Sequence, residues 1–239
     1  MIIFNRRFQP SVLMIGITLM VVVLFLALGF WQLERAAYKQ TIADRFQERL
    51  NADFKPFEPG TKDWSAIEYQ PVILEGHYDN WHTLLLDNQL SRGRVGYHVL
   101  SPFVLTNGDL VLVNRGWVPI GHSRQQLPMI KTPRIANQVK GSITVPVSTG
   151  FRMGQVSFSG HWPQVIPYID IAALQAGFTQ RLLPVVIWLA PEHDDFYERD
   201  WRPVRQSPEK SQAYAVQWFC FAVIVFILFF ILNLRRLNE

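Results

Sequence analysis

Apolar residues concentrate in two long runs near the ends of the chain. The run from Val12 to Phe30 and the run from Ala213 to Leu234 carry no charged residue. Each has roughly the 20 residues with which a helix crosses about 30 Å of hydrocarbon. The pattern predicts transmembrane helices over 12–32 and 213–234, with short tails over 1–11 and 235–239.

The first run also shares the general character of a secretory signal peptide. The apolar stretch of a signal peptide is usually shorter, about 7–15 residues, and ends at small residues. Here the run is longer, and the bulky sequence GFWQLER follows it. The run is therefore interpreted as an anchor that stays in the mature protein.

Arginine pairs flank the two runs on their outer sides. Arg6 and Arg7 precede the first run, and Arg235 and Arg236 follow the second. Basic residues close to a span stay on the cytoplasmic side, and long intervening segments do not count. Both tails are therefore expected in the cytoplasm. No Arg- and Ser-rich transit peptide precedes the first span, which favours a bacterial inner membrane and a periplasmic domain over the intermembrane space of an organelle.

Residues 33–50 contain neither proline nor glycine, so the first helix is expected to continue into water as far as about Leu50. From Tyr69 onward the chain shows short apolar runs bounded by turn residues, which is typical of strands. The expected strands cover 70–78, 83–90, 96–105, 110–118, 137–145 and 185–190. A short helix is expected over 168–178, with Asp170 near its start and Gly177 near its end.

The connections between these strands indicate the topology. The turn TNGD at 106–109 tolerates the positive φ angles of a tight hairpin. Closely spaced strands favour hairpins and an antiparallel sheet over long helical crossovers. The predicted fold class is a membrane protein in which two transmembrane helices flank one β-rich α+β domain, over 51–212, built on an antiparallel sheet.

Charge and cysteine content narrow the choice of function. The net charge of +4 is modest and the basic residues are scattered, which gives no support to nucleic-acid binding. The chain has one cysteine, Cys220, inside the second predicted span. It cannot form an intramolecular disulfide, and one thiol argues against copper or zinc carriage.

The sequence offers no recognisable active site. It lacks a G-x-S-x-G elbow, an H-E-x-x-H zinc pattern and a phosphate-cradling glycine loop. His77 and His82 flank a predicted turn, and EHDD at 192–195 is either a polar loop or a site for a divalent ion. We therefore expect a protein that is not an enzyme and holds no metal ion of its own.

The stretch VLVNRGWVP at 111–119 starts as an apolar strand and ends in polar residues. Strict alternation places Asn114 and Gly116 on one side of the strand and Arg115 and Trp117 on the other. The strand end would then present a guanidinium beside an indole. The alternative is a structural strand end, in which Asn114 bonds a turn and Gly116 allows a bulge. The residues leave both interpretations open.

Tryptophan is frequent for a domain of this size. Trp31 and Trp218 fit the aromatic belts at membrane interfaces. Other tryptophans fill the core or belong to a surface that meets a flat apolar ligand or another membrane protein. Both interpretations remain open.

Four stretches in order resemble the Surfeit locus protein 1 family of cytochrome c oxidase assembly factors, called Shy1-like in fungi. They are LGFWQLERAAYK after the first span, GRVGYHVLSPF in the centre, VLVNRGWVP, and YAVQWF at the entry to the second span. The resemblance covers nearly the whole chain. It implies help in building the haem-copper centre of oxidase subunit I, either by delivering haem a or by stabilising that subunit. The alternative is an interaction scaffold for subunit I that does not itself bind haem.

The resemblance also implies partners and a cofactor. Subunit I, other oxidase assembly factors and membrane lipid are the expected partners, and haem a is a transient ligand. In bacterial relatives proposed to bind haem a, a histidine lies three residues ahead of the tyrosine of YA, where this chain has Ser211. Serine is a poor axial ligand for haem iron. His161 or His193 would have to substitute.

The candidate site residues follow from these matched stretches. Those expected to meet the haem are Tyr214, Gln217, Trp218, Arg115 and Trp117. Those expected to meet a protein partner are Trp31, Gln32, Arg35, Arg94, Gly96, Tyr97, Asn114 and Gly116. The three arginines are suited to haem propionates.

Overall fold

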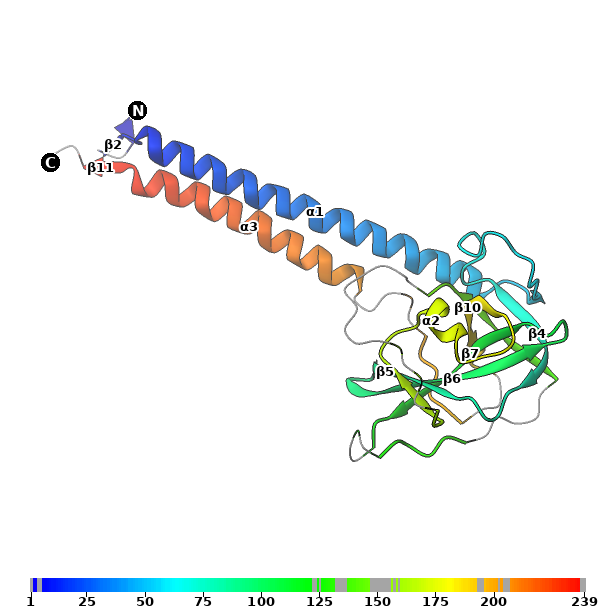
Figure 1. The fold of residues 1–239 in the computed structure, drawn as a ribbon. Helices are drawn as coiled ribbons and strands as arrows, with labels where there is room; N and C mark the ends of the chain where they lie inside the picture. Colours follow the sequence, from blue (N-terminus) through cyan, green and yellow to red (C-terminus); the bar gives the residue numbers. More distant parts are fainter. Residues whose placement is uncertain are drawn as a thin grey trace. The chain divides into compact units, whose positions relative to one another are not determined.

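The computed structural model describes residues 2–3, 6–121, 124, 126–131, 137–146, 156, 158, 160–192, 196–201, 203 and 207–236. The chain divides into two compact units (Figure 1). One unit, here called the helical unit, comprises residues 1–45 and 202–239. The other, here called the domain, runs from Phe46 to Trp201.

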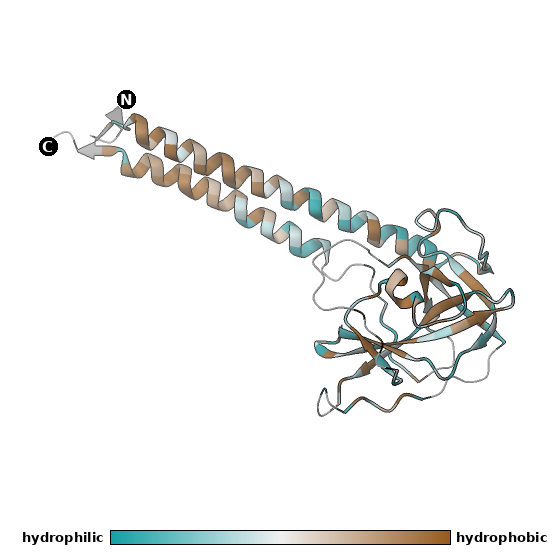
Figure 2. Ribbon diagram, in the orientation of Figure 1, coloured by the Kyte–Doolittle hydropathy of each residue, from teal (hydrophilic) through white to brown (hydrophobic). Residues whose placement is uncertain are grey.

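Two long helices form the helical unit. Helix α1 spans Val12–Leu50 and helix α3 spans Pro208–Leu232, and both are long and apolar enough to cross a membrane. Figure 2 shows the apolar colouring running from the chain ends along both helices and giving way to hydrophilic residues further along. The two expected apolar helices are thus present, and the first continues to Leu50. Helix α3 starts at Pro208, earlier than the expected boundary at 213, because proline fits the first turn of a helix.

Small residues bring the two helices close together. Ala36 of α1 and Ala215 and Ala222 of α3 are buried. A Cβ atom at Gly29 would collide with the ring of Phe219, so glycine is what allows this approach. The hydrophobic effect does not drive helices together inside a bilayer, because lipid tails are as apolar as the side chains. Close packing of small residues is the usual basis of helix association there.

The two tails pair with each other beyond the helices. Strands β1 (Ile2–Ile3), β2 (Arg6–Phe8) and β11 (Leu234–Arg236) form an antiparallel sheet, with Arg7 opposite Arg235 and Arg6 opposite Arg236. Both chain ends therefore lie at the same end of the helix pair (Figure 1).

The domain is a sheet closed into a barrel. The ring consists of β4 (Pro71–Tyr78), β8 (Gln138–Thr144), β10 (Leu182–Leu189), β7 (Leu110–Pro119) and β6 (Arg94–Leu105). It closes because β4 pairs with both β8 and β6. Strand β5 (Leu84–Ser91) extends the sheet from β6, β9 (Gln164–Ile166) pairs with β5, and β3 (Lys55–Pro56) pairs with β4.

All six expected strands are present, but the sheet is mixed. Most neighbours pair antiparallel as expected, including the β6–β7 hairpin, in which Leu105 donates to the Asp109 backbone oxygen across the TNGD turn. Strands β7 and β10 run parallel instead, as do β5 and β9 and β3 and β4. The long connection between β7 and β10 removes the hairpin constraint on which the antiparallel expectation rested. Strands β3 and β9 were not predicted, because they are too short to show a pattern.

The described residues of the domain form three apolar clusters, and the two larger ones include side chains of β7. The barrel interior is filled by aliphatic side chains and Phe103, and Val111 and Val113 are the contributions of β7. The outer face of the same strand, with Leu110 and Leu112, is covered by helix α2 (Ile171–Gln175) and its flanks. The carboxylate of Asp170 caps α2 by accepting from the Ala173 N–H at 3.2 Å, so the predicted short helix and its start are confirmed.

Candidate functional site

Strand β7 carries the stretch VLVNRGWVP at 111–119, here called the motif, and contains a bulge at Arg115. In the register with β6, Leu100 faces Asn114 and Val99 faces Gly116, so Arg115 is the extra residue of the bulge. Trp117 pairs with His98, and Leu100 lies two residues from His98 on the same face of β6. Trp117 therefore lies on the same face of the sheet as Asn114, and the expected strict alternation is wrong. An extra residue in one strand shifts all later side chains to the opposite face.

Asn114 and Gly116 shape the bulge. The Asn114 side chain accepts from the Gly116 N–H at 3.2 Å and its amide nitrogen lies 3.1 Å from Nδ1 of His98. Gly116 has a φ angle of +132°, and a Cβ there would lie 2.7 Å from both the Glu198 backbone oxygen and the Tyr197 Cβ. Asn114 and Gly116 thus have the structural roles that the alternative interpretation gave them.

Arg115 is fully buried, and its charge is held inside the domain. One guanidinium nitrogen donates to the Lys131 backbone oxygen at 2.9 Å and lies 3.5 Å from the Ser101 hydroxyl. The guanidinium also lies 4.9 Å from the centre of the Tyr197 ring. The strand end therefore does not present this guanidinium at the surface.

Trp117 joins the motif to the stretch Phe196–Trp201, here called the exit segment because the chain leaves the domain after it. The Trp117 N–H donates to the Glu198 backbone oxygen at 2.7 Å. The cation beside the Trp117 indole is Arg94, 5.0 Å from the ring, and Arg94 also pairs with the Glu198 carboxylate at 3.1 Å. Gly96 leaves the room for the indole, since a Cβ there would clash with its ring.

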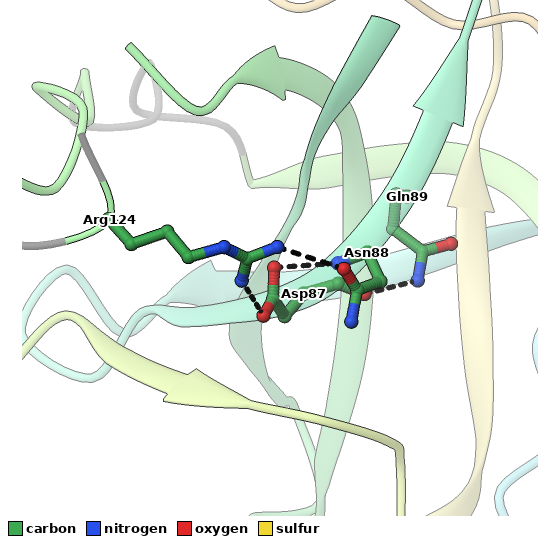
Figure 3. A network of polar contacts seen from close by, with 4 residues as sticks. All are labelled: Asp87, Asn88, Gln89 and Arg124. Carbon is green, nitrogen blue, oxygen red and sulfur yellow. Dashed lines mark hydrogen bonds and ion pairs between the residues drawn. The ribbon is translucent and has the colours of Figure 1, made fainter. Parts of the chain in front are cut away.

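A polar network around β5 lies beside the same indole, and Figure 3 shows its members Asp87, Asn88, Gln89 and Arg124. The Trp117 indole nitrogen donates to the Gln89 backbone oxygen at 2.9 Å, where β5 has an irregular register between Leu86 and Gln89. Arg124 pairs with the Asp87 carboxylate and donates to the Asn88 side chain at 2.9 Å. The Gln89 amide donates back to the Asp87 backbone oxygen at 2.7 Å. These contacts hold in place the part of β5 whose backbone oxygen accepts the hydrogen bond of the Trp117 indole.

Tyr97 lies next to this network and is buried. Burial raises the pKa of its phenol, the Asp87 carboxylate raises it further, and the Arg124 guanidinium partly opposes both. Tyr97 is therefore a neutral phenol at physiological pH.

Aromatic rings connect the motif to both ends of the domain. Trp188 stacks on Trp201 at 5.1 Å, and Trp201 meets the edge of His98 at 5.6 Å. On its other side Trp188 contacts Phe46 at 6.2 Å and Tyr69 at 6.2 Å. This row, here called the aromatic row, runs from the first residue of the domain to its last. The aromatic row therefore links the motif, through the contact of Asn114 with His98, to both ends of the domain.

The remaining predicted residues lie on the helices. Trp31 and Arg35 are exposed on α1, with the guanidinium 4.8 Å from the indole centre. Gln32 is half-buried beside them. On α3, Tyr214 and Gln217 are exposed, and Trp218 packs on Phe25 at 5.5 Å. The exposed side chains of α1 and α3 are not covered by other described parts of the chain, so a partner could contact them.

The position of the relatives' histidine is occupied by an internal contact. Ser211 is buried, and its hydroxyl accepts from the ammonium of Lys39 at 2.8 Å. Lys39 is itself buried, and no carboxylate among the described residues lies within 4.0 Å of it. The sequence of the helical unit contains no histidine. A serine hydroxyl held by an ammonium does not fit axial ligation of haem iron.

The structure describes one of the two histidines proposed as substitutes. His161 is exposed on the domain, and His193 lies outside the described residues, as does most of EHDD. Within the described part of the chain, His, Cys, Asp and Glu side chains form no group of three that could hold a metal ion. A small cavity of about 250 Å³ borders the motif, between Trp117, Lys131, Phe196 and Glu198.

Several residues that hold the site were not singled out from the sequence. They are Lys39, Asp87, Gln89, His98, Arg124, Trp188, Glu198 and Trp201. Most act through a backbone group or through a partner far away in the sequence. Trp188 and Trp201 were noted only among the frequent tryptophans of the domain.

Comparison with known proteins identifies the group to which these features belong. The model of the SURF1 family matches residues 19–223. The SURF1-like protein of Dictyostelium discoideum is 32% identical over 105 residues, which are 40% of this chain and 38% of that protein. Surfeit locus protein 1 of Mus musculus is 30% identical over 107 residues, 38% of this chain and 35% of that protein.

A fungal protein is similar over a longer stretch. The cytochrome oxidase assembly protein SHY1 of Saccharomyces cerevisiae is 28% identical over 120 residues, which are 48% of this chain and 30% of that protein. The matches thus span 30–38% of the length of these three relatives. The family model covers both long helices in part and the domain between them, and the chain belongs to the SURF1 family.

Proposed function

We propose that this protein is an assembly factor for cytochrome c oxidase that acts on subunit I at the membrane. The observation that carries the proposal is the match to the SURF1 family over residues 19–223, together with the name of the yeast relative, a cytochrome oxidase assembly protein. Two helices able to cross a membrane are what a factor acting on a membrane-embedded subunit requires. The protein acts without catalysis.

Within this role, we favour holding subunit I over ligating haem a. The contact between Lys39 and Ser211 supports this choice, because it occupies the position of the relatives' histidine with an ammonium and a hydroxyl. The exposed Trp31, Arg35, Tyr214 and Gln217 are then contacts for subunit I. Aromatic and arginine side chains are the usual anchors of protein interfaces.

The motif has a supporting role in this proposal. Asn114, Arg115, Gly116 and Trp117 are buried, and Arg115 and Trp117 contact the exit segment, so the four act by keeping the domain in shape. Arg94 and Tyr97 belong to the same support. Haem propionates would reach Arg35 on its exposed helix far more readily than the buried Arg115.

The proposed location is the inner membrane of a bacterium. The arginine pairs of the tails would lie in the cytoplasm and the domain in the periplasm. The pairing of β2 with β11 supports a common side for both tails, since it brings the arginine pairs together.

The experiment is deletion of the encoding gene followed by rescue. Membranes of the deletion strain should lose most of the haem a absorbance of assembled oxidase, and the wild-type chain should restore it. Ser211→Ala should restore it equally, because the proposed role needs no ligand at this position. An unchanged oxidase level in the deletion strain would contradict the proposed function.

A further inference from the structure

The β5–β6 hairpin ends in a tip that exposes two aliphatic side chains. Leu90 and Val95 are direct register partners, so they lie on the same face. They are 70% and 45% exposed. Arg92 and Gly93 form the turn between them, with φ angles of 49° and 77°, as in tight two-residue hairpin turns. The exposed residues Leu90, Arg92 and Val95 are here called the hairpin tip.

The opposite face of the same hairpin end is fastened to the domain. Ser91 and Arg94 are the last register pair before the turn. Both contact the Glu198 carboxylate, at 3.3 Å from the serine hydroxyl and 3.1 Å from the guanidinium. Arg94 also lies over the Trp117 ring. The hairpin tip is therefore held in a fixed conformation, so little conformational entropy is lost when it binds.

We propose that the hairpin tip inserts into the headgroup region of a bilayer that contains anionic lipid. The proposal rests on the proposed membrane anchoring of the chain. Two aliphatic side chains beside a guanidinium match the boundary between acyl chains and phosphates. Protein interfaces are instead anchored mainly by aromatic side chains and arginine in pockets. The tip has no aromatic residue.

The short connection between the hairpin tip's attachment point and helix α3 makes so small a contact sufficient. Glu198, which fastens the tip, is separated from the first residue of α3 only by residues 199–207. A group tethered close to a surface meets it at a high effective concentration. The tip therefore orients the domain at the membrane without needing to bind lipid strongly by itself.

The experiment uses nitroxide labels on the full chain in vesicles of phosphatidylglycerol and phosphatidylcholine in equal parts. Wild-type protein carries the label at its native cysteine, Cys220, which is exposed on α3. Two variants carry Cys220→Ala with either Leu90→Cys or Asn107→Cys. Asn107 is the matched control, because it lies in the polar turn of the neighbouring hairpin. The ratio of oxygen to nickel-complex accessibility reports the depth of each label.

The label at position 90 should show a ratio at least about threefold above that at position 107, as expected for a group a few ångströms into the interface. Adding Arg92→Gln, or using phosphatidylcholine alone, should reduce the difference. Equal ratios at 90 and 107, with the Cys220 label deep in the acyl chains, would overturn the hairpin proposal and leave the anchoring intact. A water-exposed Cys220 label would overturn the anchoring itself. A label at 90 that is shielded only in membranes containing subunit I would overturn lipid insertion in favour of a protein contact.

Discussion

The backbone N–H of Trp117 donates a 2.7 Å hydrogen bond to the backbone oxygen of Glu198. This bond joins the end of the motif strand to the segment through which the chain leaves the domain. It lies directly after the bulge at Arg115, which changes the direction of the following backbone. The polar residues at the end of an otherwise apolar strand therefore serve to hold the exit segment.

Gly116→Ala should destabilise the domain. Its Cβ would lie 2.7 Å from the Glu198 oxygen and from the Tyr197 Cβ, at a φ angle that side chains disfavour. Overpacking of this kind costs about 1–3 kcal/mol. Thermal unfolding of the purified full chain measures the effect. The matched control is Gly60→Ala, where nothing lies within 4 Å, and an equal loss in both variants would refute the explanation.

Arg115→Gln should be far more harmful than Arg124→Gln. The substitution removes the buried guanidinium together with its hydrogen bond to the Lys131 backbone oxygen and its contact with the Tyr197 ring, which costs about 2–4 kcal/mol. The Arg124 side chain is half exposed, and surface pairs of this kind contribute about 0–1 kcal/mol. Urea denaturation compares the free energies of unfolding. If both substitutions lower the free energy of unfolding by similar amounts, the contacts of the buried Arg115 contribute less to stability than this explanation requires.

Stability should fall at high pH because of Tyr97. The pKa of its phenol is raised in the folded state, mainly by burial and then by Asp87, so the unfolded state loses this proton first as the pH rises. The contribution is complete below about pH 10, the ordinary value, and is lost as the pH passes through the raised pKa. Denaturation series from about pH 9 to about pH 11 measure it. Tyr97→Phe should flatten this part of the curve, and a profile identical to wild type would count against the assignment.

The wild-type chain should purify without a Soret band, even from cells that make haem a. Ser211 accepts a hydrogen bond from the buried Lys39 ammonium, which leaves no axial ligand at this place. The visible spectrum of the detergent-purified chain from cells lacking subunit I is the measurement. Ser211→His in the same cells shows whether an imidazole alone restores ligation. A Soret band in the wild type would mean that another residue holds the iron.

Much of the architecture was predictable because its determinants are local. The uncharged runs, the TNGD turn and the Asp170 cap each act within a few residues, and each appears where the sequence placed it. The parallel pairing of β7 with β10 depends on how a long connection returns to the sheet, so local patterns could not show it.

The site was less predictable, because its contacts join distant residues. The motif was recognisable, yet the bulge at Arg115 depends on its pairing with β6 and on the return of Glu198. Lysine is rarely buried, so nothing in the sequence singled out Lys39 as an internal partner of Ser211. Arg124 and Asp87 likewise meet only in the folded domain (Figure 3).

Capture of newly made subunit I by the tagged full chain tests the central claim most directly. Subunit I should copurify with the wild type from cells blocked in haem a synthesis, because the proposed contact needs no haem. The double variant Trp31→Ala and Gln217→Ala should lower the captured amount by about tenfold, as loss of interface anchors does. Leu33→Ala, exposed on the same helix, should leave it unchanged. Failure of the wild type to capture subunit I, with or without haem a, would contradict the account.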